Sequence, residues 1–340
     1  MSLPACARHM KVRMPPSTSR RVGRLAVLML LAGCDAVTQP DFGGNKPLGP
    51  SPFSPAPPAP SPDVPAPIGP VHPANPPPLP PGPPGIYVAD ASGANPRLLV
   101  EGEWPAWSPD GTRIAFQRGG SIHVIDVTGS GERAIAAGVE PAWSPDGRRL
   151  ALAAAEGIVT MLEDGSERTV VVRHEFRDDT WAEGDMGVGA PAWSPDGSSI
   201  AFGHRGDGDM TPAQVFVVDL AGGSPIRLTE RRGIQYAESN PSWTPDGGAI
   251  LFWSYGYGVA SATVGGSVTS LYLNFPAVAY GSKPVSSPDG RTILVSAGQF
   301  TTGPELWTQG PDGMVRRLVS AARHGVYSPD GTRIAFVRTQ

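Results

Sequence analysis

The apolar positions of this chain fall into short runs that return along most of its length. Each run has three or four residues and is bracketed by turn-forming residues, a pattern typical of a β-strand that is covered on both faces. The runs occupy residues 114–116, 150–152, 200–202, 250–252, 293–295 and 334–336. We therefore expect an all-β domain built from repeated units.

The turn before each apolar run is a near-identical phrase. Pro-Ala-Trp-Ser-Pro-Asp-Gly stands at 105–111 and returns, with small changes, at 141–147, 191–197, 241–247, 284–290 and 325–331. Proline presets the φ angle of a type I turn, glycine lets the chain leave with a positive φ, and aspartate accepts hydrogen bonds from nearby backbone N–H groups. We interpret the repeated tryptophans and aspartates as structural residues. The aspartates are Asp110, Asp146, Asp196, Asp246, Asp289 and Asp330.

The spacing of these aspartates predicts the fold. Consecutive copies lie 36, 50, 50, 43 and 41 residues apart, a period that fits four-stranded β-propeller blades. A second hairpin follows each apolar run, but residues 86–99 form such a hairpin with no turn phrase before it, and 325–338 have no second hairpin after them. We therefore expect a six-bladed β-propeller over 86–340, with a sixth blade closed by the N- and C-terminal hairpins.

The repeat resembles that of a known family. Residues 86–99, with the sequence IYVADASGANPRLL, and residues 105–116, with the sequence PAWSPDGTRIAF, closely resemble the WD-like repeat of TolB-like β-propellers. The resemblance covers residues 86–340 and implies the same six-bladed fold. Two repeats depart from it, because Ser286 and Tyr327 stand where the others have tryptophan.

The N-terminal region has the pattern of an exported lipoprotein. Basic residues precede an apolar run at 25–32, which has the length of a signal-peptide core and is too short to span a bilayer. Leu31-Ala32-Gly33-Cys34 resembles the bacterial lipobox, which implies that residues 1–33 are a signal peptide and that Cys34 carries lipid, palmitate included. An ordinary cleaved signal with an incidental cysteine is the alternative.

Residues 34–85 are expected to form a disordered linker between the lipid anchor and the propeller. From Pro40 to Pro84 the chain has 20 prolines in 45 residues, a composition that cannot form a packed core. Proline-rich segments of this kind act as semi-rigid spacers, so we interpret the linker as a stalk.

Composition and motifs argue against several functions. The chain has 27 basic and 31 acidic residues and a net charge of −4, so it lacks the basic footprint of a nucleic-acid-binding protein. It has no Gly-x-Ser-x-Gly turn, no His-Glu-x-x-His and no phosphate-binding glycine loop. We therefore expect no enzymatic activity, no cofactor and no metal. A metal site formed by His174, His204 and His324, as in some propeller lyases, is the alternative.

Long insertions between the repeats are the candidate recognition elements. Alternating strand direction places them all on the face opposite the Ser-Pro-Asp-Gly turns, and loops on a rigid scaffold commonly carry recognition. The insertions at 173–186, 204–210 and 231–238 contain aromatic, arginine and acidic residues suited to a binding surface. The predicted ligand- or partner-binding residues are His174, Asp178, Asp179, Trp181, Arg205, Asp207, Asp209, Arg231 and Tyr236.

These expectations combine into one functional hypothesis. The chain is predicted to be a monomeric, non-enzymatic lipoprotein of the cell envelope, facing the periplasm or the cell surface and held to the membrane by its lipid anchor only. Its propeller is predicted to be a scaffold that binds an envelope protein. The alternative is a propeller that binds carbohydrate, or cleaves it as a metal-dependent lyase does, with a glycan as the partner.

Overall fold

The computed structural model describes most of the C-terminal three quarters of the chain. The described residues are 82–173, 187–205, 214–229, 238–254, 258–264, 268–269, 280–299 and 303–339. The chain divides into two units, residues 1–68 and 69–340, and every described residue lies in the second. Every secondary-structure element assigned in these residues is a β-strand. The described part of the chain has no helix that could cross a membrane.

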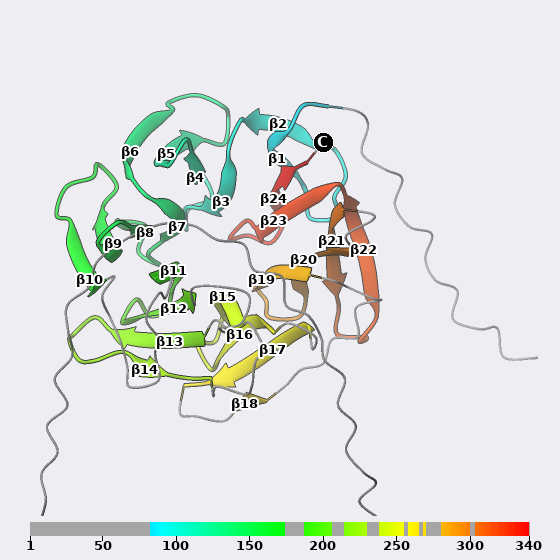
Figure 1. Ribbon diagram of the computed structural model, residues 1–340. Helices are drawn as coiled ribbons and strands as arrows, with labels where there is room; N and C mark the ends of the chain where they lie inside the picture. Colours follow the sequence, from blue (N-terminus) through cyan, green and yellow to red (C-terminus); the bar gives the residue numbers. More distant parts are fainter. Residues whose placement is uncertain are drawn as a thin grey trace, which may run out of the picture. The chain divides into compact units, whose positions relative to one another are not determined.

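Six four-stranded antiparallel sheets surround a central axis as the blades of a propeller (Figure 1). Blade 1 consists of β3 (Glu103–Trp107), β4 (Arg113–Arg118), β5 (Ser121–Asp126) and β6 (Arg133–Ala137). Blade 2 consists of β7 (Val139–Trp143), β8 (Arg149–Ala154), β9 (Gly157–Leu162) and β10 (Thr169–Arg173). Blade 3 consists of β11 (Gly187–Trp193), β12 (Ser199–Arg205), β13 (Gln214–Asp219) and β14 (Ile226–Arg227).

The remaining blades follow the same order from the axis outward. Blade 4 consists of β15 (Glu238–Trp243), β16 (Ala249–Ser254), β17 (Gly258–Thr263) and β18 (Val268–Thr269). Blade 5 consists of β19 (Tyr280–Ser286), β20 (Ile293–Gln299), β21 (Gly303–Gln309) and β22 (Val315–Ser320). Blade 6 consists of β23 (Ala322–Tyr327), β24 (Arg333–Arg338), β1 (Gly85–Asp90) and β2 (Arg97–Val100).

Blade 6 joins the two ends of the propeller. Its inner strands β23 and β24 come from the C-terminal part of the chain, and its outer strands β1 and β2 come from the N-terminal part. β1 and β24 pair without a break, from Gly85 opposite Arg338 to Asp90 opposite Arg333. The predicted closure of the ring by the two terminal hairpins is confirmed, and it removes two sheet edges that would otherwise be open.

The core lies between neighbouring blades. The repeated apolar run forms the second strand of each blade, and its phenylalanines at 116, 202, 252 and 336 are fully buried. One cluster between blades 6 and 1 shows the packing, because Ile86 and Val337 of blade 6 meet Ile114 and Phe116 of blade 1. The second strands are therefore covered on both faces, as the continuous apolar runs predict.

A repeated hydrogen-bonded turn connects the first and second strands of each blade. In blade 1 the Ser108 hydroxyl donates to Asp110 Oδ1 (2.5 Å) and accepts the backbone N–H of Arg113 (3.0 Å). The Thr112 N–H donates to the same carboxylate oxygen (3.0 Å). These hydrogen bonds, that of Ser108 first, lower the pKa of Asp110 to about 2. The other five turns repeat the pattern, with threonine in place of serine in blade 4.

The two faces of the propeller carry different connections. The six Ser/Thr-Pro-Asp-Gly turns and the connections from third to fourth strands lie on one face, which we call the turn face. The connections from second to third strands and those between blades lie on the other, which we call the loop face. Each inner strand therefore begins at the loop face and ends at the turn face.

Candidate functional site

The inner strands of the six blades share an irregularity that shapes the channel along the propeller axis. Each inner strand pairs with its neighbour on both sides of a register break, and the break falls at the same place of every repeat. Proline follows the first residue of the break in five blades, and Gly325 follows it in the sixth. Proline has no N–H to donate, so the ladder is interrupted there and the strand bulges.

The first residue of the bulge has an uncommon backbone conformation in five of the six blades. The φ angle lies between 50° and 56° at Trp104, Glu140, Ala190, Asn240 and His324, in the left-handed region that costs a non-glycine residue roughly 1 kcal/mol. Strain of this kind clusters at functional sites. Lys283 is the equivalent residue of blade 5. We call the six residues Trp104, Glu140, Ala190, Asn240, Lys283 and His324 the bulge ring.

The bulge ring surrounds a small cavity. Its members from blades 1, 2, 3, 5 and 6, with the residues that follow them, line a cavity of about 20 Å³, which holds about one water molecule. The inner strands that carry these residues meet around the axis in Figure 1. A group that enters the channel from the loop face reaches the ring before the last residues of the inner strands.

Two groups of opposite charge share this cavity. Glu140 is 7% exposed, and its Oε2 atom accepts the backbone N–H of Ala190 in the next blade (2.6 Å). Lys283 lines the cavity from the other side of the ring. Burial lowers the pKa of Lys283, and the negative charge of Glu140 opposes this change. The ring therefore holds a lysine and a glutamate in one small cavity, where electrostatic interactions are stronger than in bulk water.

An aromatic pair forms another part of the ring. The rings of Trp104 and His324 stack with their centroids 3.7 Å apart and their planes 16° apart. Burial, together with the positive charges of Arg323 and Lys283, lowers the pKa of His324 from 6.5 to about 3. His324 is therefore neutral at pH 7, so its 4.0 Å approach to Glu103 is not an ion pair.

The arrangement offers polar groups to a ligand within an apolar and aromatic wall. Asn240 Oδ1 and His324 Nδ1 are buried and have no hydrogen-bond partner among the described residues, and a buried polar atom without a partner costs about 1–3 kcal/mol. A ligand group that supplied the missing hydrogen bonds would recover this energy. The cavity of about 20 Å³ accepts one small polar group and is far smaller than a sugar ring requires.

The bulge ring was not predicted from the sequence. The repeated phrase looks uniform, whereas the residue directly before the phrase differs in every copy. The six residues in this position are the six members of the ring. The signal was therefore the one position of the motif that is never repeated.

The predicted binding residues of the loop insertions fall almost entirely outside the described residues. Arg205 is the last residue of β12, where its backbone pairs with Gly187. The described strand ends on either side of the three insertions lie at the loop face, where the inner strands begin. The residues outside the described part are His174, Asp178, Asp179, Trp181, Asp207, Asp209, Arg231 and Tyr236. The structure leaves these predictions, like that of Cys34, as predictions.

The histidines that are described lie in different parts of the blades. His123 lies in the third strand β5, His204 in the second strand β12 and His324 in the inner strand β23, while His174 is outside the described residues. Within the described part of the chain, no group of three or more His, Cys, Asp or Glu side chains could hold a metal ion.

Comparison with known proteins agrees with this architecture. The family described as TolB beta propeller domain matches residues 163–340. No curated protein matches the chain. Similarity to solved structures extends over the propeller and includes a putative TolB from Agrobacterium tumefaciens, which is 21% identical over 75% of this chain and 97% of that one, with a TM-score of 0.62.

Propellers of other names are similar in fold. The calcium-binding protein regucalcin from Agrobacterium tumefaciens is 13% identical, with a TM-score of 0.52 over 75% of this chain and 96% of that one. A chain of a nidogen/laminin complex is 9% identical, with a TM-score of 0.51 over 75% of this chain and all of that one. At these identities the likeness concerns the fold alone.

Proposed function

Because the chain belongs to the TolB β-propeller domain family, we propose that it is a non-enzymatic scaffold that binds another protein of the cell envelope. One observation supports this proposal above the others. Six inner strands have the same bulged backbone, yet the residue at the bulge is chemically different in each. A purely structural position would be expected to repeat, as the turn residues do.

The proposed binding surface is the channel entrance on the loop face. A partner segment would place a polar group against Lys283, Asn240 or His324, while Trp104 supplies the aromatic contact area that recognition surfaces favour. The insertions predicted to carry Trp181 and the acidic residues begin and end at the same face. They would form the outer part of the surface around the bulge ring.

The proposed location follows from the N-terminal sequence. A signal peptide over residues 1–33, a lipid on Cys34 and a proline-rich linker would hold the propeller at a distance from an envelope membrane. No bond is made or broken in the proposed role. The mechanism is the presentation of a rigid propeller face to a partner protein, with specificity supplied by the bulge ring and the insertions.

Photocrosslinking in the envelope of the producing cell would test this proposal. A photoreactive amino acid placed at Glu101, an exposed residue between blades 6 and 1 at the loop face, should crosslink to a protein. The crosslink should weaken about tenfold or more when Lys283→Met or Trp104→Leu is added, because these changes remove a charge or an aromatic anchor. The same photoreactive residue at Arg148 in a turn of the turn face is the matched control and should give no such crosslink.

Three results would contradict the proposal. Equal crosslinking from both faces would show contact without a specific surface. Crosslinks that are unchanged by Lys283→Met and Trp104→Leu would exclude the bulge ring. Retention of glycan and no protein by the full chain would favour the carbohydrate-binding alternative.

A further inference from the structure

Neighbouring blades 1 and 2 are fastened at the turn face by two arginines and one glutamate. Arg113 and Arg133 of blade 1 both form ion pairs with Glu163 in the turn between β9 and β10 of blade 2. Arg133 also donates to the carbonyl oxygen of Glu163 (2.8 Å). The guanidinium of Arg113 lies over the ring of Trp143, 5.1 Å from its centroid. An arginine of this chain thus fills the space above the tryptophan.

The junction of blades 6 and 1 repeats this arrangement. Arg333 lies over the ring of Trp107, 4.8 Å from its centroid, in the same place of the repeat as Arg113. Arg97 of blade 6 corresponds to Arg133, and Val127 of blade 1 corresponds to Glu163. Arg97 donates to the carbonyl oxygen of Val127 (2.6 Å). Two junctions therefore show that the ring of the repeated tryptophan accepts a guanidinium group, a favourable cation–π contact.

The junction of blades 2 and 3 lacks these contacts. Strand register places Leu220 of blade 3 where blade 2 has Glu163, and Thr169 of blade 2 where blade 1 has Arg133. Arg149 corresponds to Arg113 and forms an ion pair with Glu167 of its own blade. As a result, no guanidinium lies over Trp193 among the described residues.

The turns that follow the third strands differ in the same way. A Cβ atom at Gly165 of blade 2 would lie 3.0 Å from the carbonyl oxygen of Ile135 in blade 1, so that turn packs against the neighbouring blade. Gly222 and Gly223 of blade 3 have nothing within 4 Å of a Cβ atom. The turn of blade 3 therefore leaves a space against blade 2.

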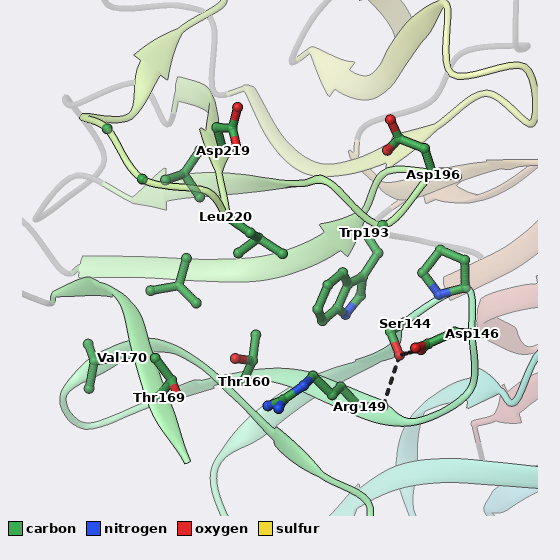
Figure 2. Close-up of a pocket in the computed structure, with 16 residues that line it drawn as sticks. Ser144, Asp146, Arg149, Thr160, Thr169, Val170, Trp193, Asp196, Asp219 and Leu220 are labelled. Carbon is green, nitrogen blue, oxygen red and sulfur yellow. Dashed lines mark hydrogen bonds between the residues drawn. The ribbon is translucent and has the colours of Figure 1, made fainter. Parts of the chain in front are cut away.

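This space is a groove of about 840 Å³ at the turn face. Figure 2 shows Thr160, Thr169 and Val170 of blade 2 on one side, Asp219 and Leu220 of blade 3 on the other, and Trp193 between them. Its walls combine aliphatic side chains with one tryptophan. This is the composition of a site that holds an apolar stem and presents an aromatic ring to a cation.

The rim of the groove is acidic. Asp146, Asp196 and Asp219 line it, while its one lining arginine, Arg149, is already paired with Glu167. Hydrogen bonds, chiefly from the serine two residues earlier in each turn, lower the pKa of Asp146 and lower that of Asp196 to about 2. Both carboxylates are therefore ionised at neutral pH and favour a positively charged ligand.

We propose that this groove binds an arginine side chain, flanked by apolar residues, from a protein partner. The guanidinium would lie over Trp193 as Arg113 and Arg333 lie over their tryptophans, and Leu220 and Val170 would contact the flanking side chains. This proposal, like the proposed function, requires a protein partner. The groove is a second binding surface, at the turn face, on the opposite side of the propeller from the channel entrance at the loop face.

A peptide titration of the full chain tests the inference. The probe is the N-acetylated peptide Gly-Leu-Arg-Leu-Gly, compared with the same peptide in which neutral citrulline replaces arginine, and both are followed by ligand-detected NMR. Loss of the charge should weaken binding by about tenfold or more. The double variant Leu220→Glu with Thr169→Arg recreates the fastening of blades 1 and 2, and it should lose the binding.

Two further variants keep the outcomes separate. Asp219→Asn removes one rim charge while leaving an acceptor for the N–H of Ala221, a bond of 2.7 Å, and it should weaken binding severalfold even if the double variant fails to fold. Lys283→Met should leave peptide binding unchanged, because it alters only the bulge ring. The inference is overturned if the folded wild-type chain does not bind the arginine peptide, if citrulline binds equally well, or if Asp219→Asn binds as the wild type does.

Discussion

The Ser/Thr-Pro-Asp-Gly turns and the bulge ring both recur in all six blades, the turns directly after the inner strands and the bulges within them. Both contain residues with a positive φ angle, but the residue types differ. Each turn contains a residue with positive φ, and in all six turns that residue is glycine, with φ between 69° and 73°. Five of the six bulges also have a residue at positive φ, and none of these residues is glycine. Glycine adopts this conformation without strain, whereas the bulge residues do not.

The difference indicates where the propeller needs a side chain and where it needs only a backbone. At the turns, identical residues repeat identical hydrogen bonds, so the position serves the fold. Five of the bulge residues retain the strained backbone, and all six side chains differ, so the position has a use that a glycine could not serve. The variants below each change either a turn residue or a residue of the bulge ring.

The largest effect is expected from removing a turn hydroxyl. Ser144 is 3% exposed, donates to Asp146 and accepts the backbone N–H of Arg149 (2.9 Å). Ser144→Ala leaves that N–H without its partner, and we expect the free energy of unfolding to fall by about 2 kcal/mol. Urea denaturation of the full chain measures it.

Blade 4 supplies the control for this prediction. Thr244 makes the same two contacts there, to Asp246 and to the N–H of Ala249, so Ser144→Thr should change the stability by less than about 0.5 kcal/mol. If Ser144→Ala and Ser144→Thr are equally stable, the turn hydroxyl does not stabilise the blade.

His324 of the bulge ring and the aspartates of the turns should make the stability of the propeller depend on pH in different ranges. The pKa of His324 falls from 6.5 to about 3 on folding, so below pH 6.5 the unfolded chain binds a proton that the folded chain does not. Stability therefore decreases as the pH falls from 6.5 towards 3. For Asp110, Asp196 and Asp330 the folded pKa of about 2 lies below the ordinary value of 3.8, and the stability that these aspartates provide is lost as the pH falls from 3.8 to 2.

Denaturation at a series of pH values separates the two contributions. His324→Gln should flatten the dependence of the unfolding free energy on pH between 6.5 and 4 by up to about one proton. Asp110→Asn should leave that range unchanged and flatten the dependence below pH 3.8 instead. A His324→Gln profile that coincides with the wild-type profile would show that folding leaves the pKa of His324 unchanged.

Features that repeat regularly along the chain could be predicted from the sequence, and features that differ between blades could not. The Ser/Thr-Pro-Asp-Gly turns use the same residues in every copy, so their spacing gave the blade number and the closure of blade 6. The bulge depends on a proline that belongs to the same phrase, but the functional candidates Glu140 and Lys283 differ from their equivalents and have no pattern of their own. Strands β14 and β18, with two residues each, were also less regular than the repeat predicts.

The groove between blades 2 and 3 could not be read from the sequence. It depends on Leu220 and Thr169 occupying the positions of Glu163 and Arg133, and these positions are equivalent only once the strand register is known. The turn phrase of blade 2 retains its arginine, Arg149, so the repeat there looks complete. Arg149 nevertheless pairs with Glu167 of its own blade and does not lie over Trp193.

The smallest effect tests the comparison of backbones directly. Gly147 has φ of 70° and room for a Cβ atom, whose nearest neighbour would be Pro109 at 3.7 Å, so Gly147→Ala should lower the free energy of unfolding by about 1 kcal/mol through backbone strain alone. Ala190→Gly, the opposite change at φ of 50° in the bulge ring, should raise it or leave it unchanged, because relief of strain offsets the entropy of glycine. Thermal or urea unfolding of the two variants and the wild type measures both changes in the free energy of unfolding. Destabilisation by Ala190→Gly as large as that by Gly147→Ala would show that the bulge residues are not strained, and the strongest physical sign that the bulge ring serves binding would be lost.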